Sequence, residues 1–163
     1  MNGDLSSVEL GKKAAAFKAL DLVKTGMILG LGTGSTAAWF IKFLAERITQ
    51  ESLEILCIPT STQTREQALS LNIPLTSLAD VDCIDLVVDG ADEFDSNLNL
   101  IKGGGGALLQ EKIVASACRK MVIITDGSKE TFCLGNFALP VEIVQFGSRS
   151  TKRHIEKIVE EMG

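Results

Sequence analysis

Aromatic residues are scarce in this 163-residue sequence, which has seven Phe, one Trp and no Tyr. Proteins that bind single-stranded nucleic acid stack the bases on aromatic side chains, so little is present here for that task. The charge balance points the same way, because 21 acidic and 16 basic residues give a formal net charge of −5. Such a surface repels phosphate polymers. We therefore expect no nucleic-acid partner, and any phosphate must be held locally by backbone amides and a few lysines.

Closely spaced cysteines and histidine pairs are also missing. The four cysteines, Cys57, Cys83, Cys118 and Cys133, form no C-x-x-C pair, which argues against a zinc site and against a dense disulfide framework. Scattered thiols of this kind are typical of buried, reduced residues, so we expect a cytoplasmic protein. The single histidine, His154, lies in a charged stretch near the end of the sequence and is interpreted as a solvent-facing residue.

A long hydrophobic run is absent as well. Residues 1–9 are mostly polar, and lysines at positions 12, 13 and 18 interrupt the first apolar stretch. This pattern fits neither a signal peptide nor a membrane span, and we expect no membrane partner. At 45% hydrophobic and 23% charged residues, the composition is that of an ordinary globular protein.

Short apolar runs alternate with segments of helical periodicity. The predicted strands are residues 27–31, 53–58, 84–89 and 121–125, and the predicted helices are residues 8–23, 35–49, 62–71 and 107–118. This rhythm is typical of an α/β fold with a doubly wound, mostly parallel sheet, which is Rossmann-like. The organisation changes after Phe132. We therefore expect a Rossmann-like catalytic domain over 1–133, followed over 134–163 by the beginning of a small, incomplete α+β domain, with a strand from Leu139 and a helix over 150–162.

The first segment of unusual composition is GLGTGSTA, from Gly30 to Ala37. It follows a predicted strand and opens a helix, so its amides and the helix dipole make a cradle for an anion, to which Ser35 and Thr36 add hydroxyls. A dinucleotide fingerprint would need an acidic residue about 20 positions later, where the next strand ends in CIPTS. We therefore favour a phosphate monoester site over a dinucleotide site, and a tight turn without a ligand is the remaining alternative.

The second segment, DGADEFD from Asp89 to Asp95, places four acids in seven residues at the end of a predicted strand. Unpaired carboxylates are costly to bury, so they need partners or water. A solvated acidic turn, a divalent-metal site and a set of acceptors for sugar hydroxyls are all compatible with the pattern. No histidine accompanies the acids and Lys102 is close, which weighs against the metal.

The third segment begins at Lys102 and continues with four glycines, Gly103 to Gly106, which open a predicted helix. Four glycines cost conformational entropy, and close approach of the backbone to a ligand is the usual reason for them. Glu111 falls about one turn into this helix, where it either reaches a substrate or pairs with neighbouring lysines at the surface. Lys129, after the last predicted strand, also has two interpretations. It is either a turn residue or a cation at the same edge of the predicted sheet.

All these segments fall at the carboxyl ends of predicted strands, where open α/β sheets bind their ligands. The motifs GTGST from Gly32, DGADE from Asp89, KGGGGA from Lys102 and D-x-S-K from Asp126 occur in this order. Together they resemble the type A ribose-5-phosphate isomerase family, and the resemblance extends from Glu9 to Gly163.

This resemblance implies an aldose–ketose isomerase of the pentose phosphate pathway that interconverts ribose 5-phosphate and ribulose 5-phosphate without metal or organic cofactor, as a homodimer or higher homo-oligomer. It implies that Glu111 is the base that moves a proton between C2 and C1, and that Asp89 helps to open the sugar ring. The residues that it places at the substrate are Thr33, Gly34, Ser35, Thr36, Asp89, Gly90, Ala91, Asp92, Lys102, Gly103, Gly104, Gly105 and Lys129, with Lys12 as a further phosphate ligand.

Other functions remain as alternatives. A sugar-phosphate sensor of the same fold would bind without turnover and would not need Asp89, Lys102 and Glu111 together. Acyl or CoA transfer on a related fold lacks a distinct nucleophile here, and an NAD-linked enzyme lacks the acidic residue noted above. Since members of the resembled family normally continue well past this length, we expect the chain to be a fragment or a short form.

Overall fold

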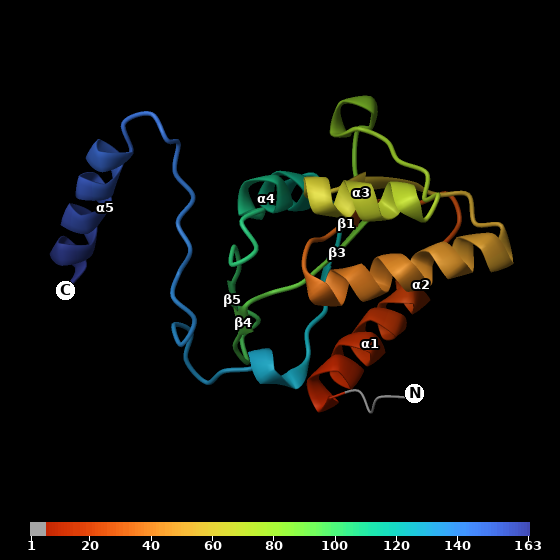
Figure 1. Ribbon diagram of the computed structural model, residues 1–163, viewed down its shortest axis with the longest axis horizontal. Helices are drawn as coiled ribbons and strands as arrows, with labels where there is room; N and C mark the ends of the chain where they lie inside the picture. The colour runs from red at the N-terminus through yellow and green to blue at the C-terminus, as the bar shows by residue number, and fades with distance from the viewer. Residues whose placement is uncertain (1–5) are drawn as a thin grey trace.

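A parallel sheet forms the centre of the computed structural model, which describes residues 6–163 (Figure 1). Its strand order is β2-β1-β3-β6, and all three pairings are parallel. The strands are β1 (Ile28–Leu31), β2 (Leu56–Pro59), β3 (Leu86–Asp89) and β6 (Met121–Ile123). Each lies within a few residues of its predicted position, so the predicted α/β fold is confirmed.

Helices connect the strands as the periodicity predicts. They are α1 (Ser7–Ala19), α2 (Ser35–Glu51), α3 (Thr62–Ser70) and α4 (Leu108–Ser116), with short 3-10 turns η1 (Leu20–Leu22), η2 (Leu78–Asp80) and η3 (Gly127–Lys129). Serine caps begin two of the helices, because the Ser6 side chain accepts a hydrogen bond from the Glu9 amide and the Ser61 side chain accepts one from the Thr64 amide. These caps explain why α1 and α3 start where they do.

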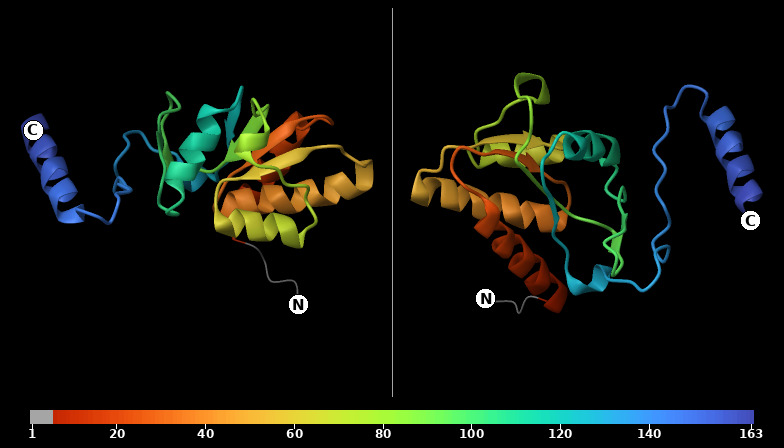
Figure 2. Two further views of the ribbon diagram at one scale, coloured as in Figure 1. Left: turned by 90° about the horizontal axis from the view of Figure 1, so that it is seen from above. Right: turned by 180° about the vertical axis from the view of Figure 1, so that it is seen from behind.

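The sheet buries both of its faces. Alternate strand residues, such as Leu29, Leu31 and Val88, pack against α1, α2 and α3 in the larger core cluster. Val87 of the same sheet belongs to a smaller cluster on the other face, together with Val114 of α4. This alternation follows from the two-residue period of a strand. Figure 2 shows α2 and α3 together on one side of the sheet.

A short antiparallel hairpin, β4 (Glu93–Phe94) with β5 (Leu100–Ile101), interrupts the loop after β3. No alternating pattern in the sequence predicts this hairpin, because its strands are only two residues long. Asp95 shapes its turn by accepting hydrogen bonds from the amides of Asn97 and Asn99. The hairpin thus places the four acids of DGADEFD in different environments, so they do not form one solvated turn.

The strand predicted from Leu139 is wrong. Residues 134–147 have no regular structure, and in the described part of the chain no neighbouring strand offers residues 139–144 a hydrogen-bonding edge. The last helix, α5 (Ser148–Met162), begins two residues before its predicted start. It lies apart from the sheet in all three views of Figures 1 and 2, and none of its residues is buried.

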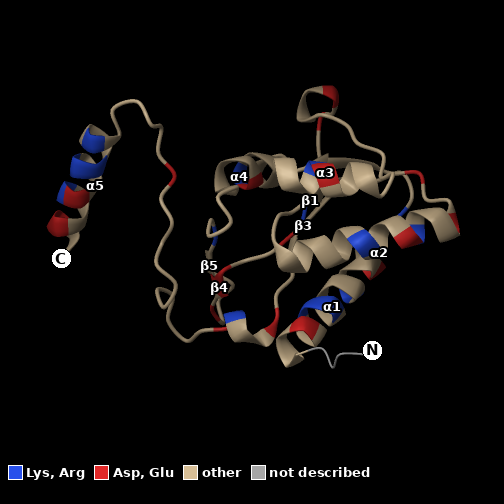
Figure 3. Cartoon of the chain, viewed as in Figure 1, with Lys and Arg blue, Asp and Glu red and all other residues tan. Residues whose placement is uncertain are grey.

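The surface of α5 has many charged residues, and its apolar side chains Ile158, Val159 and Met162 are also exposed. Basic residues lie toward its beginning and acidic residues toward its end, as Figure 3 shows. Ion pairs one turn apart, Lys152 with Glu156 and Lys157 with Glu161, support the helix. His154 is exposed here, as predicted. None of the helices among residues 6–163 combines the length and the apolar character that a membrane crossing requires.

Candidate active site

The loops after β1 and β3 meet at the point where the chain changes direction across the sheet. From β1 the chain continues to β2 on one side, and from β3 it continues to β6 on the other. Such a switch point leaves a crevice at the carboxyl ends of the strands. Two hydrogen bonds join the loops: the Gly32 amide donates to the Val88 carbonyl over 2.9 Å, and the Thr33 amide donates to Oδ1 of Asp89 over 3.0 Å.

A pocket of about 170 Å³ opens at this crevice. All the predicted site residues line it except Asp89 and Gly104, and Lys12 of α1 joins them. The structure thus brings together the four predicted segments and, as a fifth, the part of α1 that carries Lys12. It places the two exceptions just behind the wall, where they hold other residues in position.

The loop from Gly32 to Thr36 forms the wall at the beginning of α2. Gly34 precedes the helix with φ 106°, a left-handed backbone that favours glycine. The amides of Ser35 and Thr36 lie in the first helical turn, where no acceptor exists within the helix. These amides and the positive end of the helix dipole favour an anion at this wall.

Asp89, at the end of β3, is fully buried and every contact of its carboxylate is within the protein. Oδ1 accepts hydrogen bonds from the amides of Thr33 and Gly90, at 3.0 and 2.8 Å. Oδ2 accepts one from the ammonium of Lys102 at 2.9 Å. Asp89 therefore fixes the first loop and the lysine, and in this structure it has no free oxygen for a ligand.

Lys102 and Glu111 face each other at the floor of the pocket. The Lys102 ammonium also contacts the Gly90 carbonyl and lies 3.4 Å from Oε2 of Glu111. The Glu111 side chain is only 6% exposed, so the alternative of a surface acid is wrong. Its Oε2 has no hydrogen-bond partner among the residues that the structure describes. Burial and the nearby Asp89 raise the pKa of Glu111 above its usual range, although Lys102 opposes the shift.

The glycine run packs against Asp92. The Gly104 amide donates to Oδ2 of Asp92 over 2.8 Å, and a Cβ at Gly104 would lie 2.7 Å from the other carboxylate oxygen. Gly104 thus serves a contact within the protein, whereas Gly103 and Gly105 line the pocket.

One interpretation of the acidic segment is a metal site. Among residues 6–163, no group of three His, Cys, Asp or Glu side chains is arranged to hold an ion.

Two further cations reach the pocket from separate elements. Lys12 lies on α1, with its ammonium 3.6 Å from Oε2 of Glu9, and Lys129 ends η3. Both line the pocket. Lys129 is therefore a turn residue and a pocket residue at once, so the two interpretations left open by the sequence are compatible.

Sequence reasoning missed two polar groups that support the site. Thr60, Ser61 and Thr64 surround the Thr33 hydroxyl, and a dense run of hydroxyl residues after the second strand was the available signal. Glu93 is buried, and its carboxylate accepts hydrogen bonds from the amides of Gly135 and Phe137. No local pattern indicates that contact, because more than 40 positions separate the partners.

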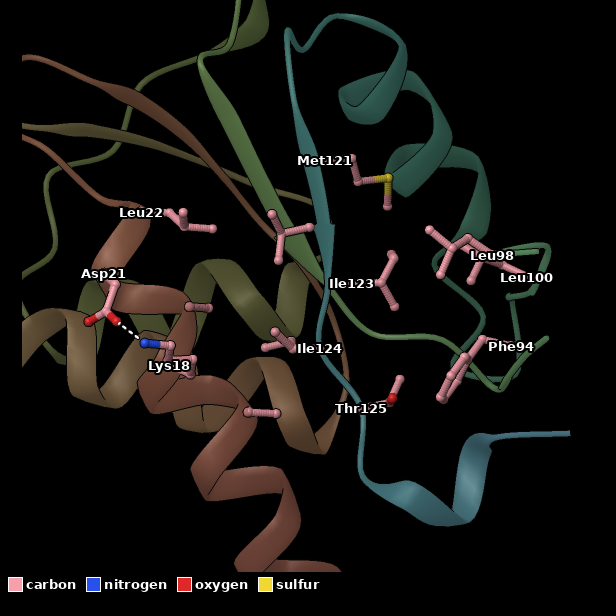
Figure 4. Close-up of a pocket in the computed structure, with 13 residues that line it drawn as sticks. Lys18, Asp21, Leu22, Phe94, Leu98, Leu100, Met121, Ile123, Ile124 and Thr125 are labelled. Atoms are coloured by element: carbon pink, nitrogen blue, oxygen red, sulfur yellow. Dashed lines mark hydrogen bonds and ion pairs between the residues drawn. The ribbon is translucent and has the colours of Figure 1, made fainter. Parts of the chain in front are cut away.

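A larger groove of about 810 Å³ runs along β6 (Figure 4). Apolar side chains such as Leu98, Leu100 and Met121 dominate its wall. Its two charged residues, Lys18 and Asp21, are paired with each other at 2.7 Å. Among the described residues that line this groove, the only carboxylate is exposed and paired with that lysine, whereas the smaller pocket contains the buried Glu111. The smaller polar pocket is therefore the candidate active site.

Comparisons with known proteins point to one family. The family model "Ribose 5-phosphate isomerase A (phosphoriboisomerase A)" matches residues 56–162. Ribose-5-phosphate isomerase A of Cereibacter sphaeroides is 54% identical over 162 residues, and the match covers 99% of this chain and 62% of that protein. The chain therefore spans somewhat less than two thirds of the length of this relative.

Solved structures agree with the sequence comparisons. Ribose 5-phosphate isomerase A from Methanocaldococcus jannaschii superimposes with a TM-score of 0.89 at 43% identity, covering 92% of this chain and 67% of the other. A D-ribose-5-phosphate isomerase in complex with phospho-erythronic acid superimposes with a TM-score of 0.88 at 40% identity, covering 91% of this chain and 66% of the other.

Proposed function

Since the chain belongs to the ribose 5-phosphate isomerase A family, we propose that its pocket is the active site of an aldose–ketose isomerase that interconverts D-ribose 5-phosphate and D-ribulose 5-phosphate. One observation carries this proposal: the buried carboxylate of Glu111 faces the Lys102 ammonium at the floor of a polar pocket, and its Oε2 has no hydrogen-bond partner among the described residues. A base and a cation side by side are what proton transfer next to a carbonyl requires.

The proton transfer has two halves. Glu111 takes the proton from C2 of the open-chain aldose, which leaves an enediolate, and then delivers the proton to C1. The oxygen on C1 gains a proton and the oxygen on C2 loses one, so the aldehyde and the secondary alcohol become a primary alcohol and a ketone. Lys102 stabilises the negative oxygen that develops between these steps. Donors held in place in this way contribute about 3–4 kcal/mol each.

The rest of the pocket divides between the two ends of the substrate. We assign the phosphate to the beginning of α2, with Ser35 and Thr36, and to the cations of Lys12 and Lys129. The remaining residues that line the wall would contact the sugar; they are Thr33, Gly34, Gly90, Ala91, Asp92, Gly103 and Gly105. Asp89 would help to open the ring through Lys102, since its own oxygens are engaged.

Three broader expectations accompany this assignment. We propose that residues 1–133 form the catalytic domain and that 134–163 begin a smaller α+β unit. Free thiols at all four cysteines suit a reducing, cytoplasmic compartment. A homodimer is expected from the family resemblance. Sedimentation of a chain extended to the length of its relatives, called the full-length protein below, would test it. A sensor without turnover finds no support, because the matched proteins named above are isomerases.

A Glu111→Gln variant tests the function most directly. Ribulose 5-phosphate would be measured after adding ribose 5-phosphate to the full-length protein, with the 163-residue chain in parallel. We expect turnover by the parent and a loss of roughly 10²–10⁴-fold in kcat for the variant, the range that a positioned base contributes. Glu66→Gln, at an exposed position of α3, is the matched control.

The outcomes separate the parts of the proposal. Full turnover by Glu111→Gln would remove Glu111 as the base. An inactive full-length parent would overturn the isomerase function itself. Activity in the full-length protein but not in the 163-residue chain would show that residues beyond this chain are needed, while leaving the assigned pocket in place.

A further inference from the structure

Four hydroxyl side chains meet behind the wall of the pocket. Oγ1 of Thr33 lies 2.9 Å from Oγ1 of Thr60, 2.9 Å from Oγ of Ser61 and 3.2 Å from Oγ1 of Thr64. Thr60 is fully buried and Thr64 is 3% exposed. These residues, called the hydroxyl cluster below, come from the loop after β1 and from the end of β2 with the start of α3. None of Thr60, Ser61 and Thr64 lines the pocket.

Two members of the hydroxyl cluster hold backbone carbonyls of the first loop. Oγ1 of Thr60 donates to the Leu31 carbonyl over 2.9 Å, and Oγ1 of Thr64 donates to the Gly32 carbonyl over 2.8 Å. The other ends of the same peptide units are held from β3. The Gly32 amide donates to the Val88 carbonyl, and the Thr33 amide donates to Asp89.

Because a peptide unit is planar, holding both its C=O and its N–H fixes the orientation of the whole unit. The unit between Leu31 and Gly32 is held by Thr60 on one side and by β3 on the other. The unit between Gly32 and Thr33 is held by Thr64 and by Asp89. Two successive peptide planes are thus clamped, and one further peptide unit, between Thr33 and Gly34, separates them from the Ser35 amide that begins α2.

Every hydroxyl proton of the hydroxyl cluster is donated to another member of the cluster or to a backbone carbonyl of the first loop. Four hydroxyl groups carry four protons. Those of Thr60 and Thr64 go to carbonyls, that of Thr33 goes to Ser61, and that of Ser61 goes to Thr64. The Thr33 hydroxyl therefore has no proton left for a ligand. What this loop offers an anion is its backbone amides, and their direction depends on the clamped planes.

We propose that Thr60 and Thr64 are positioning residues, which act through the peptide planes of the first loop to preorganise the amides of α2 for the phosphate of the substrate. This inference rests on the proposed function for the identity of the ligand. A loop that is already clamped loses little conformational entropy when the phosphate binds. Loss of the clamp therefore weakens binding of the phosphate end more than it slows proton transfer at Glu111.

The Thr64→Val and Thr64→Ser variants of the full-length protein test the proposal as a pair. Valine keeps the shape but leaves the Gly32 carbonyl without its donor, whereas serine keeps the donor and removes only a methyl group. We expect Thr64→Val to raise KM for ribose 5-phosphate about tenfold, which corresponds to about 1.4 kcal/mol, with kcat and its pH profile little changed. Thr64→Ser should stay within about twofold of the parent. Thr62→Val, exposed on the same helical turn, is the control.

Equal losses in Thr64→Val and Thr64→Ser would show that the methyl group and its packing matter, and would overturn the proposal. A fall in kcat with KM unchanged would overturn it too. Calorimetric titration with ribose 5-phosphate and with unphosphorylated ribose, in the Glu111→Gln background, separates this inference from the proposed function. We expect Thr64→Val to weaken binding of the phosphorylated sugar selectively. An equal effect on both sugars would contradict the proposal even if no isomerisation occurs.

Hydrogen exchange in the parent protein gives a test that needs no variant. The amides of Gly32 and Thr33 should be as strongly protected before ribose 5-phosphate is added as after it, because both peptide planes are already held. The amides of Ser35 and Thr36 should gain protection only with the ligand. If Gly32 and Thr33 exchange freely and become protected only on binding, the loop is not preorganised and the proposal fails.

Discussion

Nζ of Lys102 lies 3.4 Å from Oε2 of Glu111, in a pocket that leaves the Glu111 side chain 6% exposed. The same ammonium donates to Asp89 at 2.9 Å, so a single cation lies between two buried carboxylates. Asp89 shares its negative charge with two amides and the lysine. Glu111 has fewer partners, and its environment favours the protonated form more than water does. The pair therefore differs in chemistry: Asp89 organises the site and Glu111 is available to exchange a proton.

Replacing Lys102 by methionine should change both the rate and its pH dependence. The lysine opposes the rise in the pKa of Glu111, so its loss should raise that pKa further. Since the base must be ionised to act, the acidic limb of kcat/KM against pH should move to higher pH. The maximum rate should fall roughly 10²–10³-fold, because the developing oxyanion loses its cation. Initial rates of ribulose 5-phosphate formation across the pH range would measure both effects.

Lys112→Met is the matched control, because Lys112 is exposed one residue beyond Glu111 on α4. Its acidic limb and rate should match those of the parent. An unchanged acidic limb in Lys102→Met, or a shift to lower pH, would contradict the proximity of the two charges as the cause.

The stability of the Glu111→Gln variant should depend on pH in a defined direction. Burial, with a contribution from Asp89, raises the pKa of Glu111 in the folded protein above its ordinary value of 4.5. Between the unfolded and folded pKa values the folded protein binds the extra proton, so the contribution of Glu111 to stability falls as pH rises through this window. Above the window the charged group costs stability, and glutamine avoids that cost.

Thermal unfolding at several pH values would show this effect. Glu111→Gln should be more stable than the parent near neutral pH, and the difference should shrink as pH is lowered through the window. A variant that is less stable at neutral pH, by a margin that shrinks as pH is lowered, would show that the contact with Lys102 outweighs the burial of charge.

The features that the sequence predicts are those set by residues close together along the chain. The strands and helices of the sheet follow from local periodicity, and the pocket follows from glycines and acids at strand ends, so residues such as Ser35 and Lys102 were found from their neighbours in the sequence. The different roles of Asp89 and Glu111 came only from the family resemblance. Spacing alone could not predict them, because burial and contacts between separate loops determine the surroundings of each carboxylate.

Two failures have the same origin. The apolar stretch from Leu139 has the composition of a strand, yet a strand also needs a neighbouring backbone, and no pattern within the stretch shows whether one is there. The hydroxyl cluster was missed because Thr33 and Thr64 are 31 positions apart and meet only after β1 and β2 pair. In both cases the structure depends on a second segment, distant in the sequence, that the local pattern does not describe.

Gly30 links the packing of the sheet to the position of Glu111. A Cβ at this glycine would lie 2.5 Å from Cγ2 of Val87 and 2.9 Å from Cγ1 of Val114, on the helix that carries Glu111. A Gly30→Ala variant should lose about 1–3 kcal/mol of stability through overpacking and should also lose activity, because α4 must move away from the sheet. Chemical denaturation and the isomerase assay would measure the two losses.

A second substitution can restore the space. In the double variant with Val114→Ala, part of the lost stability should return, and activity should return with it. Gly127→Ala is the control, since nothing lies within 4 Å of a Cβ there. If the double variant recovers stability but none of the activity, the displacement of α4 is not the cause of the lost turnover.

Glu93 holds the irregular segment after η3 against the back of the pocket. Its buried carboxylate accepts hydrogen bonds from the amides of Gly135 and Phe137, and the Phe137 ring lies against Gly104, which in turn is bonded to Asp92. Hydrogen bonds to a charged acceptor contribute about 1.5–3 kcal/mol each.

Glu93→Gln removes the charge and turns one acceptor into a donor. The amides of Gly135 and Phe137 should therefore exchange at least tenfold faster, measured by NMR, while those of β1 stay protected. KM should rise moderately as Gly104 loses its support. Glu130→Gln, with an exposed side chain, should change neither quantity. Unchanged exchange at both amides in Glu93→Gln would mean that the ring of Phe137, and not the carboxylate, holds the segment in place.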